Sequence, residues 1–489
     1  MLERSKSANL TVKVDLSHCA SYTTKNLESA FHHVDRFKVL SLENGDSTLL
    51  RALVLKLPKS APRLRSLVIS VYMSTFSEPF FERDSVTCNL PEAMLCETEN
   101  LHYVELKGCN PSWDSQLFSS LSHLKIEWVS RAARPTTKQF LEMLKRMPNL
   151  ESMELHEAIP VECSGSVQET VHLSGLHSLS LSSPSTEINN LLRSITFPPT
   201  TRVKIVADAT PISDLKFSGM LSSLSSILAS SDKKRGKKRG LDISGLFIRG
   251  SNNFHQSLHI QASSKLELQS DLFERGLNNP TIDLNFSYRE STGSLEQFLD
   301  SVLSQIFHAF PLDNLGLLIL SDVMPSLQIL LDLFGTLNHL ESMVLMGTST
   351  NSLLDALQGT PTLGQTTPPV TSNLTFPGLR SLALVCAVFD SEDDGSGSAC
   401  ILVDSLRDCL KQRRGKGAEL HELHLKDCYY LYLDDVDLFK DFVGEVHWDE
   451  IEQEQTEEES EEEDEDDMEF SDDFEADSDA DPYSWDYYY

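Results

Sequence analysis

A short pattern of apolar residues recurs along this chain and constrains its fold more than any other feature. It reads Leu101-His-Tyr-Val104-Glu-Leu106-Lys-Gly-Cys109, an LxxLxLxxC frame, and returns as Leu420-His-Glu-Leu423-His-Leu425-Lys-Asp-Cys428. Eight looser copies begin at Phe37, Leu64, Leu121, Leu150, Leu176, Leu315, Leu340 and Leu379. Ten copies in one chain indicate a stacked array of similar units.

The spacing within the frame explains why such units stack. Its last two apolar positions alternate, which is β-strand periodicity and places both side chains on one face. One unit cannot bury that face alone, whereas stacked neighbours share a continuous core and a parallel sheet. Helical spacing precedes several frames, as at 23–37 and 48–57. We therefore predict an α/β fold over residues 1–448, an irregular leucine-rich-repeat solenoid with its parallel sheet on the concave face.

The same patterns locate individual elements. Cys109 and Cys428 are expected inside, under the turn that leaves each strand, rather than as reactive or metal-binding thiols. The frame weakens over 182–314, where strands are expected near 203–206, 246–248, 258–260 and 282–286 without a defined register. Further helices are predicted at 136–147, 295–310, 325–340, 400–412 and 434–443, with a closing strand at 445–448. Loop insertions are predicted near 230–240, 359–377 and 391–398.

The net charge of −33 is concentrated at one end of the chain. Residues 449–489 hold 22 of the 74 Asp and Glu and none of the 41 Lys and Arg, so residues 1–448 carry a net charge of −11. Such a segment repels itself and has few apolar side chains, which predicts a disordered acidic tail. Its aromatic end, Tyr483, Trp485 and Tyr487–Tyr489, is interpreted either as a short docking patch or as no site at all.

Cysteine usage and targeting signals favour a cytoplasmic or nuclear protein. The nine cysteines form no CxxC pair and no zinc-type spacing, which indicates reduced thiols and no metal site. Neither a signal peptide nor a long apolar span is visible, so no membrane association is expected. One basic run is interpreted either as a nuclear import signal or as a solvated loop: it comprises Lys233, Lys234, Arg235, Lys237, Lys238 and Arg239.

The motifs favour binding over catalysis. The sequence contains no GxSxG, GxxxxGK[ST], HExxH or DxDxDG motif, so we predict no enzyme activity, no cofactor and no metal. Polar residues between the frame positions are expected on the concave face and suit protein recognition rather than nucleic acid. These candidates are His102, Tyr103, Glu105, Lys107, Lys125, Glu127, Trp128, Ser152, Glu154, His156, His421, His424 and Lys426.

Several stretches resemble fungal F-box leucine-rich-repeat proteins of the mushroom type. They are Leu90–Leu95, Leu106–Ser115, Leu121–Ile126, the opening Leu2–Ser7, and the closing Leu423–Cys428, Asp435–Leu438 and Val446–Asp449. In that family an F-box precedes this region and docks on a Skp-type adaptor of a cullin–RING ubiquitin ligase. This chain is expected to begin after the F-box, so the resemblance implies a substrate-binding repeat region and a Skp-type partner only if an F-box lies upstream.

A second interpretation rests on the acidic tail. Repeats joined to a polyanionic tail are also typical of acidic nuclear leucine-rich-repeat proteins that bind histones or other basic proteins. Binding through the tail is expected to weaken steeply with salt, whereas binding on the repeat face should be less sensitive.

Overall fold

The computed structural model describes residues 7–17, 21–72, 87–92, 94–161, 169–209, 217–229, 242–251, 256–264, 277–288, 295–347, 351–358, 375–390 and 401–453. Within them the fold is mixed α/β, built on one large and mostly parallel sheet of sixteen strands. The compact unit of the chain extends to Gln453. Every helix among the described residues is too short or too polar to cross a lipid bilayer.

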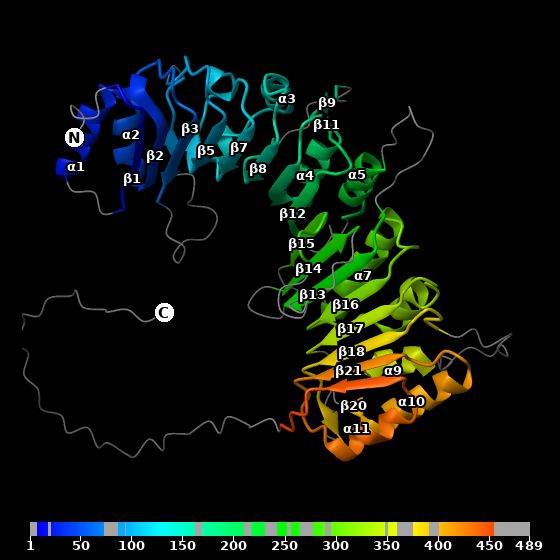
Figure 1. The fold of residues 1–489 in the computed structure, drawn as a ribbon. Helices are drawn as coiled ribbons and strands as arrows, with labels where there is room; N and C mark the ends of the chain where they lie inside the picture. Colours follow the sequence, from blue (N-terminus) through cyan, green and yellow to red (C-terminus); the bar gives the residue numbers. More distant parts are fainter. Residues whose placement is uncertain are drawn as a thin grey trace, which may run out of the picture. The chain divides into compact units, whose positions relative to one another are not determined.

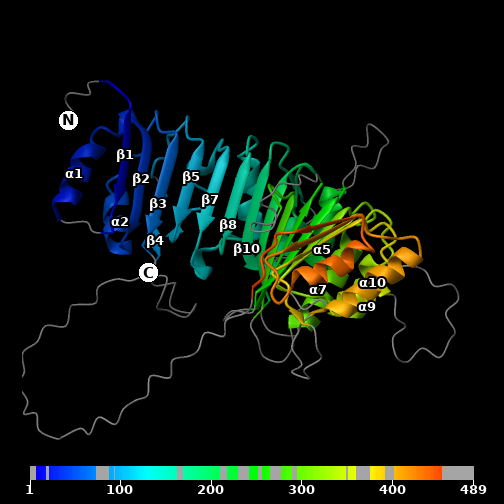
Figure 2. The same cartoon turned by 60° about the horizontal axis from the view of Figure 1, so that its bottom comes forward.

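The strands of the large sheet lie side by side with few exceptions to chain order (Figure 2). In spatial order they are β1 (Leu10–Asp15), β2 (Phe37–Gly45), β3 (Ser66–Val71), β5 (Tyr103–Lys107), β7 (His123–Glu127), β8 (Ser152–His156), β10 (Ser178–Pro184), β12 (Arg202–Ala209), β15 (Ile282–Tyr288), β14 (Gln256–Ser263), β13 (Gly245–Ser251), β16 (Leu317–Ser321), β17 (Ser342–Met346), β18 (Ser381–Val385), β21 (Glu422–Lys426) and β22 (Glu445–Trp448). Three two-residue pairs are separate: β4 (Cys88–Asn89) with β6 (Cys109–Asn110), β9 (Val171–His172) with β11 (Ile195–Thr196), and β19 (Phe389–Asp390) with β20 (Ile401–Leu402).

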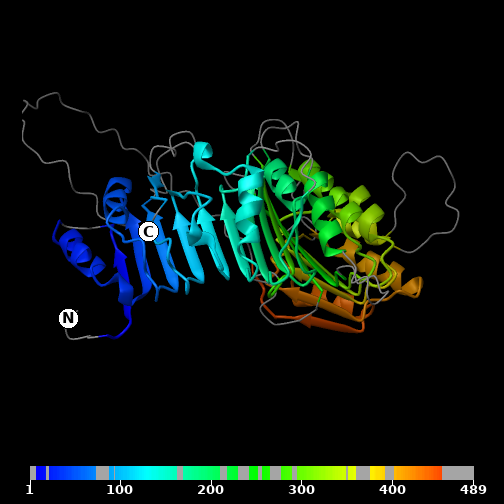
Figure 3. The same cartoon turned by 90° about the horizontal axis from the view of Figure 1, so that it is seen from above.

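Helices cover one face of this sheet (Figures 1 and 3). They are α1 (Ser21–Phe31), α2 (Ser47–Val54), α3 (Thr137–Lys145), α4 (Ser185–Leu192), α5 (Ser218–Leu228), α7 (Leu295–Ala309), α8 (Leu327–Ile329), α9 (Asn351–Gln358), α10 (Val403–Gly415) and α11 (Leu433–Lys440). Helix α5 packs between α4 and α7, and α10 packs between α9 and α11. We call the opposite face of the sheet the open face.

All ten predicted apolar frames coincide with strands of the large sheet. In β5, Val104 and Leu106 are fully buried while Tyr103, Glu105 and Lys107 are only partly covered, and β7, β8 and β10 alternate in the same way. The buried set faces the helices and forms the main core. Cys109 and Cys428, each two residues past the end of its strand, are also fully buried, which confirms the predicted place of both thiols.

A left-handed residue follows many of these strands. Seven residues that directly follow a strand of the large sheet have a positive φ angle: Gly108, Trp128, Glu157, Asp322, Gly347, Cys386 and Asp427. Except in Asp427, the N–H groups of these residues donate to a backbone carbonyl of the next unit: Gly108 donates to the Glu127 carbonyl at 2.9 Å, and Trp128 donates to the His156 carbonyl at 2.8 Å. The turn therefore keeps adjacent units in register after the strand pairing ends.

The weakly patterned middle contains the four predicted strands but departs from a uniform parallel sheet. Strand β14 is antiparallel to both β13 and β15, and β15 pairs with β12. Only four residues separate β13 from β14, and such a short connection joins antiparallel neighbours, whereas parallel neighbours need a long crossover. The predicted parallel sheet is therefore mostly parallel, with β14 as its antiparallel strand.

Some predicted helix boundaries are also wrong. Helix α1 ends at Phe31, because residues 34–36 form a 3₁₀ turn and Phe37 already belongs to β2. The helix expected at 325–340 has three α-helical residues followed by the π-helical turn Leu330–Phe334. The helix expected at 400–412 begins at Val403 and reaches Gly415, since Ile401 and Leu402 form β20.

Two predicted polar segments have ends that pack on the fold. Phe376, at the end of the loop expected over 359–377, is fully buried and donates its N–H to the Gly335 carbonyl at 2.8 Å. The first five residues of the predicted tail belong to the compact unit: Asp449 accepts a hydrogen bond from the Asp427 N–H at 2.6 Å. The insertions near 230–240 and 391–398, and the tail after Gln453, lie outside the described residues.

Candidate protein-binding face

Strand pairing aligns polar side chains from four strands across the open face. Glu105 on β5, Lys125 on β7, Glu154 on β8 and Ser180 on β10 are successive register partners. Because register partners in a parallel sheet lie one strand spacing apart, these side chains form a continuous row. Tyr103 and Lys107 extend the same face on either side of Glu105, and Glu127, Ser152 and His156 do so on β7 and β8.

Lys125 is the centre of a charge network on this face. Its Nζ lies 2.9 Å from Glu105 Oε1 and 3.3 Å from Glu127 Oε1. Burial alone would lower the pKa of Lys125, but the two carboxylates raise it above its usual range. The ammonium group is therefore held between two acceptors, one on its own strand and one on the neighbouring strand.

Glu105 also accepts a hydrogen bond from Tyr103, whose hydroxyl lies 2.6 Å from Oε2. Burial would raise the pKa of Glu105, but this bond and the one from Lys125 hold it below its usual range. Burial, followed by the bond to Glu105, raises the pKa of the Tyr103 hydroxyl. The geometry fixes a phenol, a carboxylate and an ammonium in one arrangement before any ligand arrives.

Glu154 differs from the other carboxylates of the row. It is half-buried on β8, next in register to Lys125, yet its carboxylate makes no hydrogen bond or ion pair with any residue that the structure describes. Lys125 is already bound to Glu105 and Glu127. Glu154 is therefore a carboxylate without a partner among the described residues, and a ligand could engage it beside the Lys125 network.

An aromatic cluster adjoins the charge network at the carboxyl ends of β5, β7 and β8. Lys107 Nζ lies 4.7 Å from the Trp128 ring centroid, and the Trp128 and His156 rings are 5.3 Å apart at 58°. Trp128 has a φ of +56°, a rare conformation for a large side chain. The sequence singles out all three residues, but nothing in the LxxLxL frame predicts the left-handed turn that brings the indole beside them.

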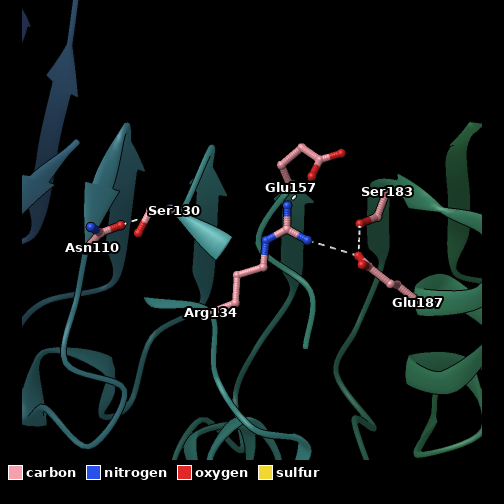
Figure 4. A network of polar contacts seen from close by, with 6 residues as sticks. All are labelled: Asn110, Ser130, Arg134, Glu157, Ser183 and Glu187. Atoms are coloured by element: carbon pink, nitrogen blue, oxygen red, sulfur yellow. Dashed lines mark hydrogen bonds and ion pairs between the residues drawn. The ribbon is translucent and has the colours of Figure 1, made fainter. Parts of the chain in front are cut away.

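An ion network that was not predicted from the sequence lies in the segments that follow β7, β8 and β10 (Figure 4). Arg134, in the loop after β7, donates to Glu157 after β8 and to Glu187 Oε2 in the first turn of α4, the latter at 3.0 Å. Ser183 Oγ donates to the same Glu187 oxygen at 2.5 Å. Burial raises the pKa of Glu187. The network joins three successive units at the edge that carries Trp128 and His156.

No sequence signal marked this network as a unit. Glu187 lies 53 positions from Arg134 in the sequence. Taken alone, each residue would be predicted to be a solvent-exposed charge on a loop or a helix. The closest hint is the Thr136–Gln139 capping box, which is present and fixes where the helix after Arg134 begins. Near this network, the Ser130 N–H after β7 donates to Asn110 Oδ1 after β5 at 3.0 Å (Figure 4).

The candidates near the end of the chain form a second, separate group. His424 on β21 stacks on His447 of β22, with ring centroids 4.5 Å apart, and lies 3.2 Å from Glu422. Lys426 lies further along the same strand face. Between this group and Lys125 the register row passes through four buried apolar residues: Phe247, Ile319, Val344 and Ala383. The structure therefore does not gather all the candidates into one site.

Two further candidates lie outside the strands, and one predicted site is not described. His102 and His421 are exposed and directly precede β5 and β21. The basic run at 233–239 lies outside the described residues. Within the described part of the chain, no cluster of three or more His, Cys, Asp or Glu has the geometry of a metal site.

The charge network and the aromatic cluster together carry fixed donors, acceptors and ring faces, which is the chemistry of a recognition surface. Comparisons with protein-family models and with curated proteins find no match to this chain.

Proposed function

We propose that this chain is a non-catalytic protein-recognition module that binds a protein ligand on the open face of β5, β7 and β8. The observation that carries the proposal is the preorganised set of Tyr103, Glu105, Lys125 and Trp128 beside Glu154, whose carboxylate has no partner in the described part of the chain. Side chains already fixed lose little conformational freedom on binding. Aromatic residues beside charged ones are also enriched at the energetic centres of interfaces.

The architecture we propose is a leucine-rich-repeat solenoid with this sheet on its concave face. Three repeated features support it: the ten apolar frames in strands, the left-handed residue after many of them, and the buried thiols of Cys109 and Cys428. An array of this kind offers a long continuous surface to a ligand. The antiparallel β13–β14–β15 segment is an irregularity within it.

The biological role we propose is the substrate-binding repeat region of an F-box-type ubiquitin ligase subunit. Support comes from the resemblance carried by stretches within Leu90–Ile126 and Leu423–Asp449, together with the open-face chemistry. In this role the chain itself performs no reaction, and a Skp-type adaptor is a partner only where an F-box lies upstream. The ligand is a protein substrate, and neither nucleic acid nor membrane is a partner.

The proposal is tested by affinity purification from native cells with the full chain and with Glu154→Lys. This open-face change is expected to release the ligand without disturbing the fold, because Glu154 holds no partner among the described residues. Lys138→Glu, an exposed reversal on α3, is the matched control and should retain it. Co-purified adaptor and cullin support the ligase role. A partner set that is identical for all three proteins contradicts recognition by this part of the open face.

The second candidate function is binding of basic proteins by the acidic tail. The specific observation is the run of 22 acidic residues without Lys or Arg over 449–489. Partners that depend on this run should dissociate between low and physiological salt and be lost when residues 454–489 are deleted. Open-face partners should survive both treatments.

A further inference from the structure

Exposed apolar side chains gather at the last turn of the described chain, away from the open face. Tyr432 is 42% exposed and Leu433 51%, both at the start of α11, and Ile451 after β22 is 43% exposed. Leu438 on the same helix is also exposed. These four are the majority of the large hydrophobic residues that the described chain leaves exposed, since the others are Leu55 and Tyr72.

Hydrogen bonds bring the two segments together. The Leu433 N–H donates to Glu452 Oε1 at 3.2 Å, and the Tyr430 N–H donates to the Gln453 carbonyl at 2.9 Å. Ile451 therefore lies beside the start of α11, and we call Tyr432, Leu433 and Ile451 the terminal apolar surface. Helix α11 packs against β22, the last strand of the large sheet, at the orange end of the ribbon (Figure 1). Partly buried Val446 and Trp448 of β22 continue the core toward this end.

The charge of the segment that carries this surface is predominantly negative. Residues 432–453 contain eight Asp and Glu and a single Lys or Arg, Lys440, which lies 2.6 Å from Asp437. Asp434 and Glu450 are exposed and have no hydrogen bond or ion pair within the described residues. The sequence then continues with further acidic residues and no Lys or Arg. A partner that covers the apolar side chains must therefore bring positive charge to their rim.

We propose that the terminal apolar surface binds a basic, amphipathic protein segment, which seats apolar side chains on Leu433 and Ile451 and places Lys or Arg against Asp434 and Glu450. A purely polar basic chain leaves the apolar area exposed to water, and an apolar chain leaves the carboxylates facing it without counter-charges. This surface is separate from the open face, so the two sites are independent.

The test measures binding of a synthetic Lys/Leu amphipathic peptide to the full chain by fluorescence anisotropy at low and physiological salt. Leu433→Ser with Ile451→Ser should weaken binding at least about tenfold while leaving the salt dependence unchanged. Leu55→Ser, which alters an even more exposed leucine at the end of α2, is the control and should bind as the parent does. Asp434→Asn with Glu450→Gln should instead reduce the salt dependence, whereas Asp313→Asn should not.

Two results overturn the proposal. If the Leu433 and Ile451 double variant binds as tightly as the parent, the acidic sequence alone holds the peptide. If the parent self-associates in analytical ultracentrifugation and the double variant does not, a second copy of the chain covers the surface. Glu154→Lys should leave peptide binding unchanged, so failure of this site and failure of the open-face function are separable.

Discussion

Cys109 and Cys428 occupy equivalent places in two distant copies of the same apolar frame. The Cys109 thiol donates to the Ile69 carbonyl at 3.7 Å, and the Cys428 thiol donates to the Leu384 carbonyl at 3.6 Å. In each case the acceptor belongs to the preceding strand of the sheet. The thiol thus satisfies a buried carbonyl between adjacent units, the role of a structural residue rather than a reactive one.

The two thiols should therefore resist alkylation in the folded protein. Burial raises the pKa of Cys428 to about 12 and that of Cys109 well above its usual range, so thiolate is scarce at neutral pH. Among the cysteines that the structure describes, Cys386 is the exposed one and should react first despite its raised pKa. Site-resolved mass spectrometry after a pulse of iodoacetamide checks this. Early labelling of Cys109 or Cys428 would show that the turn opens readily.

Removing Arg134 should destabilise the protein substantially. The guanidinium is mostly buried and is the cation that joins Glu157 and Glu187, so Arg134→Ala leaves two carboxylates without it. We expect the free energy of unfolding to fall by about 3 kcal/mol, as when one partner of a buried ion pair is lost. Lys138→Ala, at an exposed position of α3, should change it by less than about 0.5 kcal/mol. Chemical denaturation of both variants provides the measurement.

Glu187 should also contribute a specific pH dependence. Its folded pKa is raised above the ordinary value of 4.5, so the native state binds this proton more tightly than the unfolded state does. The contribution is fully present below about pH 4.5 and is lost as pH rises through the folded pKa. Relative to Glu187→Gln, the parent should therefore lose stability as the pH rises over that window. Parallel slopes for the two proteins would contradict the assignment.

Tyr103→Phe should weaken the open-face network without breaking it. It removes one hydrogen bond to Glu105 and leaves Lys125 in place, which costs about 1 kcal/mol. The lowered pKa of Glu105 contributes stability above about pH 4.5 that is lost as pH falls through the folded value. In the variant this pKa should move up toward 4.5, and NMR titration of Glu105 reports it directly.

Two glycines should respond to alanine in opposite directions. Gly347 has a φ of +60° after β17, and an added Cβ would lie 2.8 Å from Asp322 Oδ1, so Gly347→Ala should cost about 1–2 kcal/mol. Gly415 ends α10 with no atom within 4 Å of an added Cβ, so Gly415→Ala should stabilise by up to about 0.5 kcal/mol. Thermal unfolding of the pair separates backbone strain from a general effect of substitution.

The sequence predicts the strands well because their apolar residues repeat at a spacing that only stacked units satisfy. A register shift of one residue in β5 would turn Val104 and Leu106 out of the core, so the apolar frame admits one register. The helix boundaries are predicted less accurately, because short connections to the neighbouring strands set where each helix begins and ends. Helix α1 ends at Phe31 and α10 begins at Val403 for this reason. The antiparallel direction of β14 follows from its short connection to β13, and the apolar frame does not extend into this part of the sequence.

The candidate site is predictable in part for a related reason. Strand alternation identifies Tyr103, Glu105 and Lys125 as residues of one face, and pairing then sets their distances. The left-handed φ of Trp128 and the joining of Arg134 to Glu187 arise from loop conformation and from contacts between units. Neither the φ angle of Trp128 nor this ion pair produces a periodic pattern that could be recognised in a single sequence.

The central claim is that the open face binds a protein. Its most direct test is photo-crosslinking in native cells, with p-benzoylphenylalanine replacing Glu154 on the open face or Lys138 on α3, followed by mass spectrometry of the covalent adducts. We predict a specific protein adduct from position 154 and none from position 138. Adducts that form only from position 138, or equally from both positions, would contradict recognition by the open face.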